Sequence, residues 1–128
     1  MIERVYEHVF VSRWDPSWDF IIVDETSDLQ DRLIRFYTEY AARIFDYDWV
    51  RIFIHSGLRA HSITPRYLAL IEKKIIVPVC LEMRKYKSSD PSSSLDLPVS
   101  EREREAVWGL HGQIFYICLL YTSDAADE

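Results

Sequence analysis

The most regular pattern in the chain lies at residues 28–45, DLQDRLIRFYTEYAARIF. Its apolar side chains recur at steps of three and four residues, and its opposite face carries two pairs of opposite charge spaced four residues apart. This periodicity predicts an amphipathic helix over residues 28–45. Ser27, followed three residues later by Gln30, is a capping-box signal at its start.

Two shorter helices are predicted from their start signals. At residues 65–74 a threonine precedes a proline, an N-cap followed by the residue best tolerated in a first helical turn. At residues 101–110 Ser100 and Glu103 form a capping box, and the acids that follow suit the positive end of a helix. Two glycines near residue 110 are expected to end this helix.

Between these helices the chain carries short runs of β-branched and aromatic residues, which favour strands. Pro78 lies inside one run and would place that strand at a sheet edge, because proline cannot donate to a ladder. The order of elements predicts an α+β (or α/β) fold, with a four- or five-stranded sheet covered by the three helices. The predicted strands lie near residues 5–11, 19–24, 49–54, 75–81 and 112–117.

Charge is distributed unevenly along this 128-residue chain, whose formal net charge is −6. Residues 1–48 hold eleven acids and five bases, whereas residues 49–87 hold eight bases and two acids, with two tyrosines among them. Such a block could attract a phosphate backbone while tyrosines stack on bases. Alternatively, it pairs with the acidic N-terminal third or forms a solvated face. The candidate nucleic-acid-binding residues are Arg59, Arg66, Lys73, Lys74, Arg84, Lys85 and Lys87.

Two tryptophans are the candidate residues for binding a protein partner. Trp14 and Trp18 lie in the sequence WDPSW, whose proline predicts a turn. Exposed tryptophans in a turn would be suitable anchors for a partner, although most tryptophans are packed in or beside the core.

The chain has few patterns that carry chemistry. His55 and His61 are spaced for neither a helical nor a hairpin metal site, and Cys80 reads as a small buried hydrophobe. The acids near residues 15–25 could belong to a two-metal nuclease, but they also lie where a helix start favours negative charge. No GxSxG or phosphate-binding glycine loop occurs. We therefore predict no catalytic residue, metal or cofactor in this segment and leave enzyme activity open.

The sequence also bears on location. It contains no apolar run of membrane-spanning length and no signal-peptide pattern at its start, so we expect a soluble intracellular protein without a membrane partner. Residues 87–100, rich in Ser, Pro and Asp, are expected to form a flexible loop.

The last eleven residues, CLLYTSDAADE at 118–128, resemble the translation of a transposase-type sequencing-library adapter. This resemblance implies that residues 118–128 are a non-native tail. Residues 1–117 would then be a single α+β domain or the N-terminal fragment of a longer protein, whose missing C-terminal domain is a possible partner.

A second resemblance concerns residues 29–71, about a third of the chain. The patterns LQDRLIRFY, YDWVRIFIHSGLRAHSI and ALIEK resemble the N-terminal region of polinton-type, protein-primed family B DNA polymerases. The chain departs from that family where it has Leu58-Arg59 and Ser62-Ile63 in place of Leu-Asp and Pro-Ile dipeptides. The resemblance implies a non-catalytic accessory segment, with the metal-binding acids of the polymerase beyond the junction at residue 117.

These observations support two functional hypotheses. In the first, the chain is a non-catalytic N-terminal accessory domain of a larger nucleic-acid-processing protein, with the basic block near phosphates. In the second, it is a protein–protein interaction module with no nucleic-acid role.

Overall fold

A computed structural model describes residues 1–90 and 95–127, and its regular structure is helical. Across these two ranges no residue is in a β-strand, so the predicted α+β or α/β fold with a four- or five-stranded sheet is wrong. The elements are α1 (Ile2–Val5), the π-helical turn η1 (Tyr6–Val11), α2 (Trp18–Ile21), α3 (Leu29–Ile44), α4 (Tyr47–Leu58), α5 (Ile63–Ile71), the π-helical turn η2 (Glu72–Ile76), α6 (Val77–Lys87) and α8 (Glu101–Asp127).

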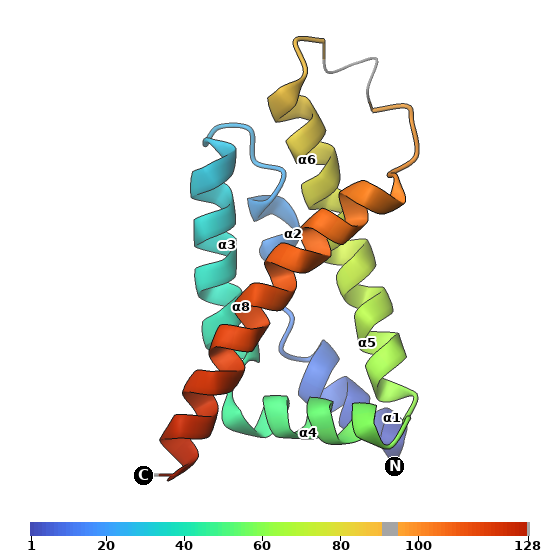
Figure 1. Ribbon diagram of the computed structural model, residues 1–128, viewed down its shortest axis with the longest axis vertical. Helices are drawn as coiled ribbons and strands as arrows, with labels where there is room; N and C mark the ends of the chain where they lie inside the picture. Colours follow the sequence, from blue (N-terminus) through green and yellow to red (C-terminus); the bar gives the residue numbers. More distant parts are fainter. Residues whose placement is uncertain (91–94, 128) are drawn as a thin grey trace.

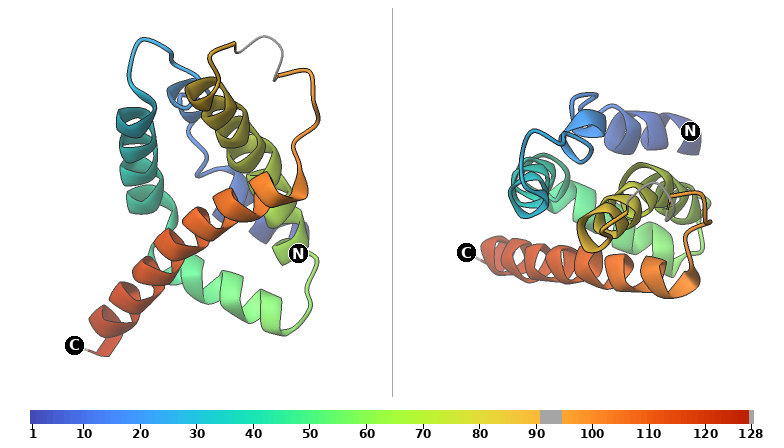
Figure 2. Two further views of the ribbon diagram at one scale, coloured as in Figure 1. Left: turned by 45° about the horizontal axis from the view of Figure 1, so that its top comes forward. Right: turned by 90° about the horizontal axis from the view of Figure 1, so that it is seen from above.

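The helices are arranged in three layers, seen most clearly from above in Figure 2. The middle layer contains α3, α4 and the continuous rod formed by α5, η2 and α6. The N-terminal helices lie on one side of it, and α8 crosses the other side (Figure 1). Because α8 contacts α3, α4, η2 and α6, it ties the middle layer together.

The predicted helix at 28–45 is confirmed as α3. Its N-cap is Asp28 rather than Ser27: the Asp28 carboxylate accepts a hydrogen bond of 3.2 Å from the Gln30 backbone N–H. The helix buries Phe36, Tyr40 and Ile44 completely, so the apolar stripe read from the sequence is the face that packs.

The strand predicted at 49–54 is instead the middle of α4. Asp46 caps this helix by accepting the Trp49 N–H at 2.8 Å. In a helix Trp49 and Phe53 share one face, and their rings stack 5.0 Å apart against the core. A short run of β-branched and aromatic residues fits a strand or a buried helix equally well, and here the aromatic core selects the helix.

The strand predicted at 75–81 is also helical. The helix predicted at 65–74 begins at Ile63 and continues through η2 and α6 to Lys87. Pro78 lies in the first turn of α6, directly after the wider π-helical turn. Proline lacks an N–H and collides with the carbonyl four residues earlier, and a π-helical turn is a means of accommodating it.

The helix predicted at 101–110 begins where expected and continues to Asp127 as α8. Its capping box is confirmed, because Ser100 N–H donates to Glu103 at 2.8 Å and Glu103 N–H contacts Ser100 Oγ at 3.3 Å. The glycines at 109 and 112 do not end it, and the strand predicted at 112–117 is part of the same helix. Glycine weakens a helix by only about 1 kcal/mol, less than the packing of α8 supplies.

The N-terminal strands predicted near 5–11 and 19–24 are replaced by α1, η1 and α2. The loop predicted at 87–100 lies between α6 and α8, and its residues 91–94 are outside the described residues. Near α8 the described part of this connection is held by Arg84, which donates to the Leu97 and Pro98 carbonyls at 2.6 and 2.8 Å.

Aromatic rings dominate the core. Trp18, Phe36, Tyr40, Trp49 and Tyr67 are each 2% exposed or less. The hydroxyls of Tyr40 on α3 and Tyr67 on α5 lie 2.5 Å apart, and burial raises the pKa of both, so the pair stays protonated and joins the two helices. Over the described part of the chain, no helix combines the length and apolar character needed to cross a membrane.

Candidate functional site

Two of the bases predicted to bind nucleic acid pair with acids of the N-terminal third. Arg66 on α5 binds Glu3, with 2.7 Å between Nη1 and Oε2, and its guanidinium lies over the Tyr6 ring. Lys74 binds Asp19 at 2.9 Å. Both bases therefore pair with acids of the same chain, as in the alternative in which the basic block pairs with the acidic N-terminal third.

Two more predicted bases are paired on α6. Arg84 forms a bidentate pair with Glu103 of α8, at 2.5 and 2.7 Å. Lys85 bridges Glu25 at 2.8 Å and the buried Glu82 at 2.9 Å. These contacts fasten α6 to α8 and to the segment before α3.

The remaining predicted bases are Arg59, Lys73 and Lys87. Within residues 1–90 and 95–127 none of the three forms an ion pair. Arg59 follows α4 and Lys87 ends α6, so a helical rod of about 37 Å separates them at 1.5 Å per residue. The structure does not bring the seven bases together into one surface, and nucleic-acid binding stays a prediction.

The two candidate partner-binding tryptophans pack inward. Trp18 is 1% exposed, and its indole N–H donates to Glu39 at 3.2 Å. Trp14 is half-buried and meets Trp18 edge to face, with 5.2 Å between ring centroids. Trp18 therefore has almost no surface to offer, and a role for either residue in partner binding stays a prediction.

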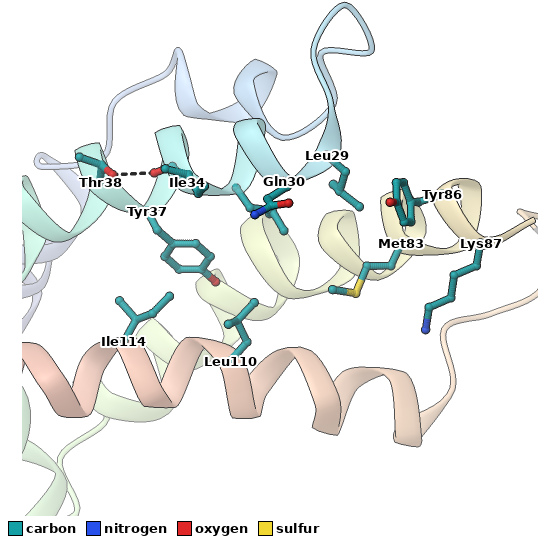
Figure 3. A pocket seen from close by; sticks show the side chains of 11 residues that line it. Leu29, Gln30, Ile34, Tyr37, Thr38, Met83, Tyr86, Lys87, Leu110 and Ile114 are labelled. Carbon is teal, nitrogen blue, oxygen red and sulfur yellow. Dashed lines mark hydrogen bonds between the residues drawn. The ribbon is translucent and has the colours of Figure 1, made fainter.

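A different surface has the character of a binding site: an apolar groove of about 690 Å³ between α3, α6 and α8. Ile34, on the α3 side, is 58% exposed, and Tyr86, on the α6 side, is 70% exposed. Most lining side chains are aliphatic or aromatic (Figure 3). The residues lining the groove are Leu29, Gln30, Leu33, Ile34, Tyr37, Thr38, Met83, Tyr86, Lys87, Leu110 and Ile114.

His111 is one of the residues that hold α8 against α3 at the groove. Its Nδ1 lies 3.2 Å from the hydroxyl of Tyr37, which extends from α3 toward α8 in Figure 3. His111 is 7% exposed and also faces the rings of Tyr40, Phe45 and Trp108. Burial lowers the pKa of His111 to about 4, so its imidazole is neutral at physiological pH.

A buried ion pair holds α3 and α6 together behind the groove. Arg32 Nη1 lies 2.8 Å from Glu82 Oε2 and donates to the Ile22 carbonyl at 2.5 Å. The two side chains are 9% and 3% exposed, and Lys85 contacts the other oxygen of Glu82. Breaking such a pair would leave one charge buried without a partner, which is strongly destabilising. The contact therefore holds the α3 and α6 walls of the groove together.

Two of the acids considered for a metal site are held by local contacts, and Asp19 and Glu25 pair with Lys74 and Lys85. Asp15 accepts the Ser17 N–H at 2.9 Å, and Asp24 accepts the Thr26 N–H and hydroxyl at 3.1 and 2.6 Å. These hydrogen bonds are the main cause of the lowered pKa of both carboxyls. In the described residues no three histidine, cysteine or acidic side chains converge to hold a metal ion.

The sequence does not predict the groove, although four of its lining residues belong to the apolar face predicted for the helix at 28–45. Leu29, Leu33, Ile34 and Tyr37 were placed on the apolar side of one helix. The apolar face of this helix is wider than the part that packs against the core, so Ile34 at its edge remains exposed. An unusually wide apolar face was the available signal.

Comparison with known protein families, curated proteins and solved structures finds no match to this chain.

Proposed function

We propose that this protein is a protein–protein interaction module that holds an amphipathic helix of its partner in the groove between α3, α6 and α8. The groove itself carries this proposal, because a large apolar surface left open to water is typical of an interaction site.

The dimensions of the groove suit a helix. The lining residues of α3 run from Leu29 to Thr38, about 14 Å at 1.5 Å per residue. Helical ligands usually anchor through side chains at positions i, i+4 and i+7, which span about 10 Å. Leu110 and Ile114 of α8, one turn apart, provide a second wall of similar character.

The ion pairs favour this function over phosphate binding. Four of the seven candidate bases already hold carboxylates, and the other three lie far apart, just after α4, on η2 and at the end of α6. A phosphate backbone would have to displace these carboxylates, whereas a partner helix needs only the apolar groove.

The test uses a fluorescein-labelled helical peptide of about 16 residues with leucines spaced four and then three residues apart. Fluorescence anisotropy measures its affinity for the wild-type chain and for Ile34→Asp. A charge in the groove should weaken binding about tenfold or more, since the leucine contacts are lost and a carboxylate must be desolvated.

The matched control is Leu68→Asp. Leu68 on α5 is 40% exposed and does not line the groove. This variant should bind the peptide within about twofold of the wild type. Circular dichroism confirms that both variants remain folded. Equal loss of binding in both variants, or no binding by the wild type, would rule out the groove as the binding site.

A further inference from the structure

The groove is neutral along most of its length and charged at one end. Gln30, Tyr37, Thr38 and Tyr86 contribute its other polar atoms, and Lys87 is the one charged side chain among the described lining residues. Figure 3 shows the Lys87 side chain extending from the end of α6 toward α8, beside Met83.

The acids near this end of the groove hold other partners. Glu82 is shared by Arg32 and Lys85, and Glu25 binds Lys85. Asp28 caps α3 through the Gln30 N–H. Lys87 forms no ion pair with any described residue, so its charge is available to whatever fills the groove.

We propose that the partner helix carries an acidic side chain beside its apolar anchors, positioned to pair with Lys87, so that this site selects acidic amphipathic helices. This inference rests on the proposed function. The pairing of Lys87 with an acidic side chain is a local effect. The net charge of the whole chain, −6, would by itself favour a basic ligand.

The experiment compares two labelled peptides that share the leucine spacing described above. The acidic probe has glutamate on both flanks of the leucine face, and the basic probe has lysine there, so that either orientation in the groove is tested. Anisotropy titrations near physiological salt, where the Debye length is about 8 Å, suppress the long-range repulsion from the protein's net charge.

The wild type should bind the acidic probe about two- to fivefold more tightly than the basic one, the range measured for partly exposed ion pairs. Lys87→Met, which keeps most of the apolar stem, should remove that preference, and Lys87→Glu should reverse it. Lys73→Glu makes the same charge change on η2, outside the groove, and should leave the ratio as in the wild type.

The outcomes separate the two proposals. If both probes bind equally, or the basic one binds more tightly, and binding still requires Ile34, the acidic preference is wrong and the interaction groove stands. A preference that Lys73→Glu alters as strongly as Lys87→Glu would likewise overturn the role of Lys87. If neither probe binds, both proposals fail.

Discussion

The two sides of the middle layer differ in how completely they are covered. On the N-terminal side Phe10 of η1 and Trp18 of α2, which pack against the middle layer, are 0% and 1% exposed. On the side crossed by α8, Ile34 and Tyr86 are 58% and 70% exposed. Both sides are rich in apolar side chains, so composition alone does not explain the difference.

Side-chain size and helix direction explain it. The N-terminal segments cover their side with bulky rings, and several ion pairs close its rim, including Arg43–Asp15 at 3.0 Å and Arg13–Asp46 at 2.6 Å. In Figure 1 α8 crosses α3 obliquely, so the two helices diverge toward the start of α3. Leu110 and Ile114 line that gap without filling it. The comparison shows one side that is closed by packing and one that leaves an apolar groove open.

The largest expected effect tests the closed side. Trp18→Ala should lower the free energy of unfolding by about 3–5 kcal/mol, because it leaves a cavity where a fully buried ring packed. Ile34→Ala on the open side should change it by about 0.5 kcal/mol or less. Urea unfolding followed by circular dichroism measures both. Similar losses in the two variants would contradict the comparison.

A second effect concerns the His111 contact that holds α8. Its folded-state pKa, about 4, lies below the ordinary value of 6.5, so between these pH values the unfolded chain binds more protons. The contribution of His111 to the free energy of unfolding should therefore be fully present above about pH 6.5. The free energy of unfolding should fall by about 2–3 kcal/mol as the pH drops through 4.

The measurement is urea unfolding at several pH values for the wild type and for His111→Gln, which keeps polar atoms near Tyr37 but does not titrate. The difference between the two should shrink as the pH falls. His8→Gln, at an exposed site in η1 on the closed side, should retain the wild-type dependence. If His111→Gln shows the same pH dependence of the free energy of unfolding as the wild type, other groups cause that dependence.

A third prediction concerns the glycines of α8. Gly109 and Gly112 are exposed, and a Cβ at either position would meet no atom within 4 Å. Replacing both with alanine should raise the free energy of unfolding by about 1–2 kcal/mol, because alanine loses less conformational freedom in a helix. An unchanged urea midpoint would mean that α8 ends near Gly109, as the sequence pattern predicted.

The smallest expected effect concerns the end of α4, away from the two compared sides of the middle layer. Ala60 follows α4 with φ of 53°, and the His61 and Ala60 N–H groups bond to the Ser56 and Gly57 carbonyls in a Schellman arrangement. Glycine is preferred there, so Ala60→Gly should stabilise the protein by about 0.5–1 kcal/mol. Ala42→Gly, at an exposed site inside α3, should destabilise it by a similar amount. Thermal melts compare the two, and the same sign for both would refute this assignment.

Part of the fold could be predicted because its signals are local. The α3 periodicity and the Ser100–Glu103 capping box involve residues a few positions apart, and both predictions are confirmed. The runs at 49–54 and 75–81 failed because side chains such as Trp49 and Ile75 suit a strand or a buried helix equally. Only their distant contacts decide between the two.

The candidate site could be predicted even less. Arg66 and Glu3 are 63 positions apart, and Arg32 and Glu82 are 50 apart, so their pairing is not visible in a charge pattern. The groove combines residues of α3, α6 and α8 that the sequence separates widely. The basic block indicated phosphate binding, whereas the sequence signal for the groove was limited to the wide apolar face of α3.

By itself, the sequence determined the start of α8, the extent of α3 and the uneven distribution of charge, because each depends on neighbours within a few residues. The tertiary structure alone decided that the apolar runs are helices, that most candidate bases hold acids, and that a groove stays open beside Lys87. Burial in a shared aromatic core sets the first of these. The directions of helices that meet only after folding set the other two.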